Sequence, residues 1–299
     1  MDLLEKFSAV EIRPTDCMTE ADRQFCQRQQ KAYQNAVEVF YQIAALWTEL
    51  YDRQKTALST PEDRHGKWKK KYLVSGWWPE ISVDAIMKHI SSLHSEFIST
   101  VVSYLNDTYH LTLDAYSVKD GLLPKEPSCT GYEETPNRSV LAPVILHYVD
   151  AVDLILSRFE GRTFEEQSHY ELVERCHRAA WRERDRQTNF EQKKNLVKIF
   201  SGACSYGYYS NHEQWHIYDS AKSILKALAY FETGAFGQYP DGIDDLLSEN
   251  GYLWYDLWEL EDCEKLEKIR LFKNGRMDIR FTSEGHARAF VSGFLGTIW

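Results

Sequence analysis

The chain has 299 residues, with 35 basic and 45 acidic side chains and a formal net charge of −10. Its 43% apolar and 14% aromatic content excludes an intrinsically disordered protein, because disordered chains lack the apolar residues that form a core. The acidic balance argues against a generic nucleic-acid binder and against a basic membrane-surface protein, since both need clustered Lys and Arg. The length allows one large domain or two ordinary ones.

The first helix is predicted by a capping box, in which Thr19 and Asp22 satisfy each other's backbone groups, and it ends near Ala57. Apolar side chains recur along it at helical spacing: Phe25, Ala32, Ala36, Phe40, Ile43, Trp47 and Leu50. A helix this long is typical of a hairpin or bundle, and it makes a homo-oligomer a reasonable expectation. A second helix is expected from about Ser82 to Leu105.

A basic and aromatic connector follows the first helix, over residues 59–82. It contains the following residues: Lys67, Trp68, Lys69, Lys70 and Lys71. The lysines could meet phosphates while Trp68 stacks on a base, which makes this connector a candidate nucleic-acid site. The alternative, which we favour, is a solvated loop whose tryptophans cover the end of a helical bundle.

The best internal boundary is the loop over 121–136, which contains Pro, Gly and Ser. It separates a long-helix N-terminal region, residues 1–120, from a helical C-terminal domain, residues 137–299. Helices are expected over 137–159, after a capping box at Thr163 and Glu166, and from Ser210 to about Glu232.

The C-terminal end differs from the helical pattern before it. Apolar and charged residues alternate on both sides of Asn274 and Gly275, a pair that favours a type I′ hairpin turn. The apolar members are Ile269, Leu271, Met277, Ile279 and Phe281, and a closing helix is expected from Ala287 to Phe294. The expected fold class is therefore mainly α, a long helical hairpin or bundle with a small C-terminal β-hairpin, and α+β overall.

The sharpest motif is HExxH, formed by His212, Glu213 and His216. On a helix, residues i and i+4 place both imidazoles on one face to bind Zn²⁺, and the glutamate polarises the attacking water. The third ligand would be Glu232 or Asp219. Zinc is the cofactor of this hypothesis alone, and otherwise no cofactor is expected.

The alternative reading, which we favour, is structural: Ser210 and Glu213 fit a capping box, so the motif is the start of a helix with solvent-facing histidines. Support for nucleophilic catalysis is weaker. Cys176 and His177 are adjacent and would point about 100° apart on a helix. The sequence contains no GxSxG, P-loop or GxGxxG motif.

Residues 241–267 form an acidic and aromatic segment with ten acidic side chains and one basic one. Aromatic anchors among charges of one sign favour a protein-binding surface, with the aromatics supplying affinity and the charge steering the encounter. The candidate partner-binding residues are Asp244, Asp245, Trp254, Trp258, Glu259 and Asp262. Alternatively, the segment mimics nucleic-acid charge, or it is an amphipathic helix that packs its tryptophans inward.

Three stretches, at 92–114, 224–234 and 271–290, resemble a little-characterised domain family of plasmids, phages and other mobile elements, sometimes found beside DNA methyltransferases. The chain carries no Gly-rich nucleotide loop and no methyltransferase motif, so it is similar to the accessory domain without the enzyme. The resemblance implies a mobile-element setting and assigns no catalytic residue.

Three hypotheses follow. The first is a non-enzymatic mobile-element protein that binds another macromolecule, such as a host anti-phage defence complex that it would inhibit. The second is an HExxH zinc-dependent hydrolase, and the third is a DNA-associated accessory protein. Residues 1–14 carry no apolar signal region, no stretch approaches the ~18 apolar residues of a membrane span, and the six cysteines form no CxxC pair. A cytoplasmic protein with no membrane contact is therefore expected.

Overall fold

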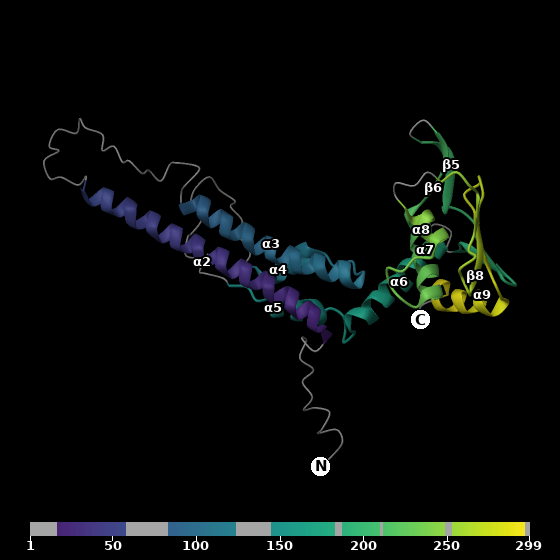
Figure 1. Ribbon diagram of the computed structural model, residues 1–299, viewed down its shortest axis with the longest axis horizontal. Helices are drawn as coiled ribbons and strands as arrows, with labels where there is room; N and C mark the ends of the chain where they lie inside the picture. The colour runs from purple at the N-terminus through teal and green to yellow at the C-terminus, as the bar shows by residue number, and fades with distance from the viewer. Residues whose placement is uncertain are drawn as a thin grey trace, which may run out of the picture. The chain divides into compact units, whose positions relative to one another are not determined.

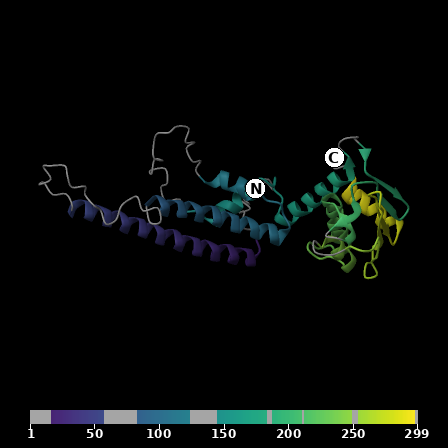
Figure 2. The ribbon, with the colours of Figure 1, turned by 90° about the horizontal axis from the view of Figure 1, so that it is seen from above.

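The computed structural model describes residues 17–57, 83–123, 145–182, 187–209, 212–248 and 253–296. The chain divides into two compact units (Figures 1 and 2). Unit 1 comprises Met1–Thr108 and Leu113–Thr163, and unit 2 comprises Tyr109–Thr112 and Phe164–Trp299. Most of the expected boundary at 121–136 lies outside the described residues, and the chain on both sides of it belongs to unit 1.

The described helices of unit 1 are α2 (Glu20–Ala57), α3 (Val83–Tyr109), α4 (Ala115–Leu122) and α5 (Tyr148–Ser157). The predicted capping box at the start of α2 is confirmed. The backbone N–H of Thr19 donates to the Asp22 carboxylate at 2.8 Å, and the backbone N–H of Asp22 donates to Thr19 Oγ1 at 3.2 Å. Tyr104 of α3 also donates to Asp22, at 2.8 Å, so the cap ties the two helices together.

Helices α2 and α3 run side by side and antiparallel, as both views show (Figures 1 and 2). Three ring stacks join them: Phe25 with Tyr104, Tyr33 with Phe97, and Phe40 with His89. Residue numbers rise along α2 as they fall along α3, so these contacts form the expected helical hairpin.

The buried face of α2 is not the one that the sequence predicts. Its buried residues include Cys26, Tyr33, Val37 and Ala44, whereas Ile43 and Leu50 of the predicted apolar stripe are exposed. Neighbouring residues point about 100° apart around a helix, so a difference of one position selects another face. Helix α2 therefore carries two apolar faces, and α3 covers only one of them.

A buried hydrogen-bonded pair sits between these helices. The backbone N–H of Leu146 donates to Tyr33 Oη at 3.2 Å, and Tyr33 Oη lies 2.7 Å from His94 Nδ1. A neutral imidazole can accept the phenol proton at Nδ1. Burial lowers the pKa of His94 below its usual value, because the charged ring would lose its hydration.

We expect the stability of unit 1 to fall as pH drops below the ordinary histidine pKa of about 6.5. The sign follows from the lowered pKa of His94: the unfolded chain takes up the proton at a higher pH than the folded chain does. Replacing His94 with Gln keeps an acceptor for Tyr33 and removes the titration. Measured by urea unfolding, the free energy of unfolding should therefore fall less between pH 8 and pH 5 for His94→Gln than for the native chain. Equal decreases for the two chains would show that His94 does not cause the pH dependence.

Unit 2 contains helices α6 (Phe164–Ala180), α7 (Asp219–Thr233), α8 (Asp241–Leu247) and α9 (Glu284–Phe290), the last continued by a π-helical turn (Val291–Leu295). A five-stranded antiparallel sheet has the order β3-β4-β9-β8-β7. Its strands are β3 (Phe190–Lys193), β4 (Leu196–Ile199), β9 (Met277–Phe281), β8 (Leu266–Leu271) and β7 (Leu257–Glu259). Two smaller ribbons pair β1 (Trp181–Arg182) with β2 (Gln187–Thr188), and β5 (Cys204–Tyr209) with β6 (His212–Ile217).

Alternation along the strands gives the five-stranded sheet one apolar face. Val197 lies opposite Ile279, which in turn lies opposite Ile269, and all three are buried. Helices pack on this face: Phe281 of β9 meets Phe231 of α7 and Phe290 of α9. The other face carries charged side chains, which belong in water.

The expected fold class is wrong, because the β structure extends through much of the C-terminal half and is not a small hairpin. Strand β3 carries no apolar alternation that would indicate it, because its residues are Phe190, Glu191, Gln192 and Lys193 and none of them is fully buried. The hairpin between β3 and β4 also lacks a glycine signal, since Lys194 itself adopts the positive φ of 53°. Strand β4 forms because it pairs with β9. This partner lies far along the chain, so the periodicity of the residues around β4 does not reveal the pairing.

The C-terminal hairpin is confirmed in its pairing, with Leu271 opposite Met277 and Ile269 opposite Ile279. The expected type I′ turn is wrong. The N–H of Gly275 donates to the Phe272 carbonyl at 2.8 Å, and only Gly275 has a positive φ, of 83°. This is a type I turn followed by a glycine bulge, in which Asn274 needs no left-handed backbone.

Candidate functional site

The HExxH motif lies on a strand. His212–Ile217 forms β6, and α7 begins only at Asp219, so both the expected helix over the motif and its capping box are wrong. Strand residues rise about 3.3 Å each, so positions 212 and 216 lie about 13 Å apart. One zinc ion holds each imidazole nitrogen at about 2.0 Å and cannot bridge that span. Glu213 instead accepts a hydrogen bond from Tyr206 at 3.0 Å, which raises the pKa of Tyr206.

Glu232 anchors a loop. Its carboxylate accepts the backbone N–H groups of Glu264 at 2.6 Å, Lys265 at 3.0 Å and Leu266 at 3.2 Å. Lys265 Nζ in turn donates to the Glu232 carbonyl at 2.8 Å, at the end of α7. Within the described ranges, no group of three or more His, Cys, Asp or Glu side chains is placed to hold a metal ion.

The buried thiols of Cys26, Cys176 and Cys204 lie in environments that keep them protonated. Burial raises the pKa of Cys26 to about 12 and also raises the pKa of Cys176, which is fully buried. His177 lies beside Trp181 and is only partly buried. Cys204 Sγ is 3.5 Å from the Arg276 carbonyl, in the core beneath the hairpin turn. Low-pKa thiolates are the nucleophilic form of cysteine, so none of these three is activated.

The acidic and aromatic segment does not form one helix. It supplies α8, an irregular stretch and strand β7. The candidate acids Asp244, Asp245, Glu259 and Asp262 are all exposed. Trp258 is buried in the core beside Ile269, where a partner cannot reach it, whereas Trp254 is exposed. The partner-binding candidates therefore separate into surface acids, one surface tryptophan and one core tryptophan.

Trp254 is one of three exposed aromatic side chains on or next to the β5–β6 ribbon. Tyr208 is 75% exposed, Tyr255 73% and Trp254 51%. Tyr206 and Phe272 are half-buried and carry cations over their rings. We call these five residues the aromatic surface.

Backbone pairing brings the aromatic surface together. Strand β5 pairs with β6, and the backbone N–H of Trp215 in β6 donates to the Leu253 carbonyl at 2.9 Å, which places Trp254 and Tyr255 next to the ribbon. The N–H of Leu271 donates to the Asp256 carbonyl at 2.8 Å, which brings the Phe272 turn to the same region. The ribbon starts in the core and ends exposed, and Figure 1 shows β5 and β6 rising beyond α7 and α8.

Cations line the aromatic surface. Arg276 Cζ lies 3.8 Å from the centre of the Phe272 ring, and Arg270 Cζ lies 5.4 Å from it. Lys273 Nζ is 4.3 Å from the centre of the Tyr206 ring. Such contacts hold long side chains in place over aromatic faces. The site therefore combines fixed cations with exposed rings, bordered by the carboxylates of Glu213 and Asp256.

Sequence reasoning missed Tyr206, Tyr208, Tyr255 and Phe272. The residues over 201–209 are small, glycine-bearing and aromatic, a composition that is also typical of a loop or a tight turn. The alternation of Tyr206 and Tyr208 around Gly207 is the signal that could have indicated a strand with one aromatic face.

On the charged face of the five-stranded sheet, basic side chains form ion pairs with neighbouring acidic ones. Lys193 pairs with Glu191 at 2.9 Å, Lys268 with Glu267 at 3.3 Å, and Arg270 with Asp256 at 3.3 Å. Bases neutralised in this way offer little attraction to phosphates, so the face is a solvated surface. The connector residues Lys67, Trp68, Lys69, Lys70 and Lys71 lie outside the described residues.

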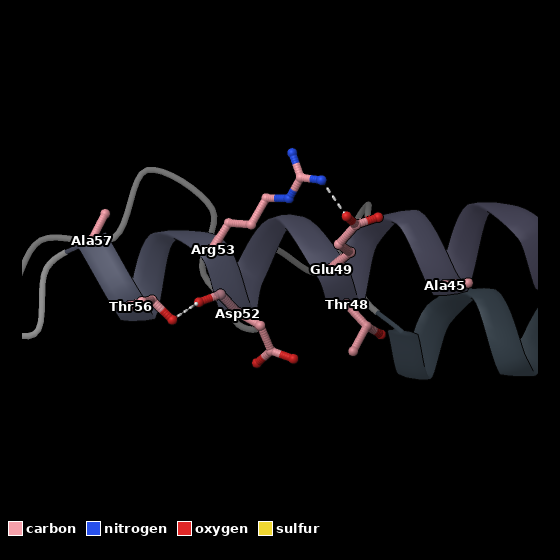
Figure 3. Close-up of a pocket in the computed structure, with 7 residues that line it drawn as sticks. All are labelled: Ala45, Thr48, Glu49, Asp52, Arg53, Thr56 and Ala57. Atoms are coloured by element: carbon pink, nitrogen blue, oxygen red, sulfur yellow. Dashed lines mark hydrogen bonds and ion pairs between the residues drawn. The ribbon is translucent and has the colours of Figure 1, made fainter.

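A hollow on α2 offers no enclosed ligand site. The residues that line it are Ala45, Thr48, Glu49, Asp52, Arg53, Thr56 and Ala57, all from one helix (Figure 3). Arg53 pairs with Glu49, and Thr56 Oγ1 donates to the Asp52 carbonyl at 2.9 Å. Small molecules bind in concave sites that surround them, which one helix face cannot provide.

Among the described residues, no helix combines the length and apolar character that crossing a bilayer requires. Comparisons of the chain with models of protein families, with curated proteins and with solved structures found no significant match.

Proposed function

We propose that the chain is a non-enzymatic binding protein whose partner is another protein, held at the aromatic surface of unit 2. The observation that carries this proposal is the exposure of Tyr208, Trp254 and Tyr255, on or next to a ribbon whose neighbouring turn holds arginines over the Phe272 ring. Tyr, Trp and Arg are the residues that most often dominate the energy of protein–protein binding. Contiguous exposed aromatics are costly in water and typically mark such interfaces.

The first sequence hypothesis supplies the class of partner. The resemblance to mobile-element domains favours a host anti-phage defence complex that this chain binds and inhibits. The zinc-hydrolase alternative loses its basis, because its two histidine positions lie four residues apart on a strand. The DNA-associated alternative rests on residues 67–71 alone.

The proposal is tested by affinity purification of the full chain from host lysate, followed by mass spectrometry. The bait is compared with a Trp254→Ala, Tyr255→Ala double variant and with Tyr116→Ala, a control that removes an equally exposed tyrosine from α4 of unit 1. We expect one set of host proteins to be captured by the native chain and the control and lost from the double variant. Identical capture by all three baits would contradict the proposal.

Exposed acids should speed the encounter with this partner. Changing Asp244, Asp245, Glu259 and Asp262 to the corresponding amides should lower the association rate about tenfold at low salt, because charge steers diffusion before contact. The dissociation rate should change little, and the difference should fade at high salt. Rates would be measured by surface plasmon resonance.

The matched control changes the same number of exposed acids in unit 1. These are Glu38, Asp107, Asp120 and Asp150. It alters net charge equally but leaves the acidic segment intact, so an equal loss of association rate in both variants would contradict a local steering role.

A further inference from the structure

Helix α2 carries an exposed apolar stripe that no described part of the chain covers. Val39 is 51% exposed, Ile43 39%, Leu46 64% and Leu50 43%. Their spacing of four, three and four residues places them in one line, as at the a and d positions of a heptad. We call these four residues the α2 stripe.

The α2 stripe is distinct from the face that packs on α3. The core residue Ala44 directly follows Ile43 in the chain, so the two side chains point about 100° apart. Two apolar faces at this angle are typical of a helix in a four-helix bundle, which contacts two neighbouring helices. Helix α3 lies along one of these faces and α5 contacts α2 near Gln30, and the stripe marks the place of a further helix.

We propose that the α2 stripe is a self-association surface, on which a second copy of the chain docks its own α2 in the antiparallel direction. With the twofold axis near Tyr41, Val39 lies opposite the partner's Ile43. The same register places Ala36 opposite the partner's Leu46, and Ala32 opposite the partner's Leu50. In the two outer pairs a leucine meets an alanine, which lets the two helices approach closely, while Val39 and Ile43 pack on each other at the axis.

Charge along the flank of the stripe fits the antiparallel direction. Arg28 and Lys31 are exposed near the start of α2, and Glu49 and Asp52 lie three heptads later on the same flank. Antiparallel pairing brings the basic end of one helix beside the acidic end of the other, whereas parallel pairing stacks like charges. Figure 3 shows Glu49 and Asp52 on the surface of the last turns of α2, with Glu49 also paired to Arg53.

The test measures the mass of the full chain in solution by analytical ultracentrifugation, at concentrations up to about 100 μM, well above a micromolar dissociation constant. We expect a dimer for the native chain and a monomer for Leu46→Glu, which buries a charge against the partner's Ala36. The exposed position and the high helix propensity of glutamate should leave the fold intact, as circular dichroism would verify. Thr48→Glu adds the same charge on the opposite side of α2 and should remain dimeric.

Charge reversal then tests the direction of pairing. Arg28→Glu with Lys31→Glu should weaken the dimer at least tenfold, and adding Glu49→Lys with Asp52→Lys should restore it at low salt. A native chain that is monomeric throughout would overturn the proposal. A dimer that persists in the Leu46→Glu variant would also overturn it. So would a Leu46→Glu variant that is less stable but has the same mass as the native chain, because that result would mean that residues 58–82 of the same chain cover the stripe. Failure of charge rescue would overturn the antiparallel direction.

Discussion

Replacing Trp254 or Tyr255 with alanine should weaken partner binding about 30-fold, which corresponds to the loss of about 2 kcal/mol that is usual for an aromatic hot spot. Both side chains are more than half exposed, so their removal costs the folded chain little and any loss reports on the complex. The double variant should lose affinity 100-fold or more, although adjacent residues share contacts and their effects do not simply add. Isothermal titration of the identified partner measures these values.

Tyr116→Ala serves as the matched control, because it removes an equally large exposed ring from unit 1. We expect its affinity for the partner to stay within about twofold of the native value, as for most residues outside a hot spot. If Trp254→Ala and Tyr116→Ala had the same affinity, the aromatic surface would not be the binding site.

Phe281→Ala should destabilise unit 2 by about 3–5 kcal/mol, the cost of deleting a buried phenylalanine and leaving a cavity. Phe281 is fully buried on β9 and contacts Phe231 and Phe290, so one substitution removes support from a strand and two helices. Native-state hydrogen exchange measures the effect locally. Amides of β8 and β9 should exchange much faster, while those of α3 keep their protection.

Phe200→Ala provides the contrast for this second variant. Phe200 follows β4 and is exposed, so its loss should cost less than about 1 kcal/mol. Equal protection of β8 and β9 in the two variants would mean that Phe281 does not hold sheet and helices together.

The parts of the fold that could be predicted are those with a strong local signal. Thr19 and Asp22 bond to each other within one helical turn, and the hairpin strands around Gly275 show a clear period of two. Their turn type was not predictable from the Asn-Gly pair, because the same pair suits a type I turn followed by a glycine bulge. The protein adopts the longer turn, which places Gly275 against the start of β5.

The parts that could not be predicted depend on distant residues. Strands β3 and β4 are short, and β4 is fixed by pairs such as Val197 with Ile279, which no local pattern reveals. Trp258 and Trp254 lie four residues apart in one acidic segment, yet one is buried and the other exposed because only Trp258 sits on the inner face of the sheet. The zinc site predicted from HExxH does not form for a related reason. The motif brings its two histidines together only on a helix, and here it lies on strand β6.

Helix α2 illustrates a different difficulty. Its apolar pattern is the sum of two faces, one with Val37 and Ala44 in the core and one with Val39 and Leu46 exposed. The one apolar stripe predicted from the sequence therefore mixes residues from the buried face and from the exposed face. Only the position of α3 distinguishes the face that builds the hairpin from the face that stays exposed.

Hydrogen exchange of the full chain, with and without its captured partner, tests partner binding at the aromatic surface most directly. Binding should slow exchange in the peptides that carry this surface, namely those over 204–217, 253–257 and 271–277, while α3 and α4 stay unchanged. Protection confined to unit 1, with no change over 253–257, would contradict the proposed function.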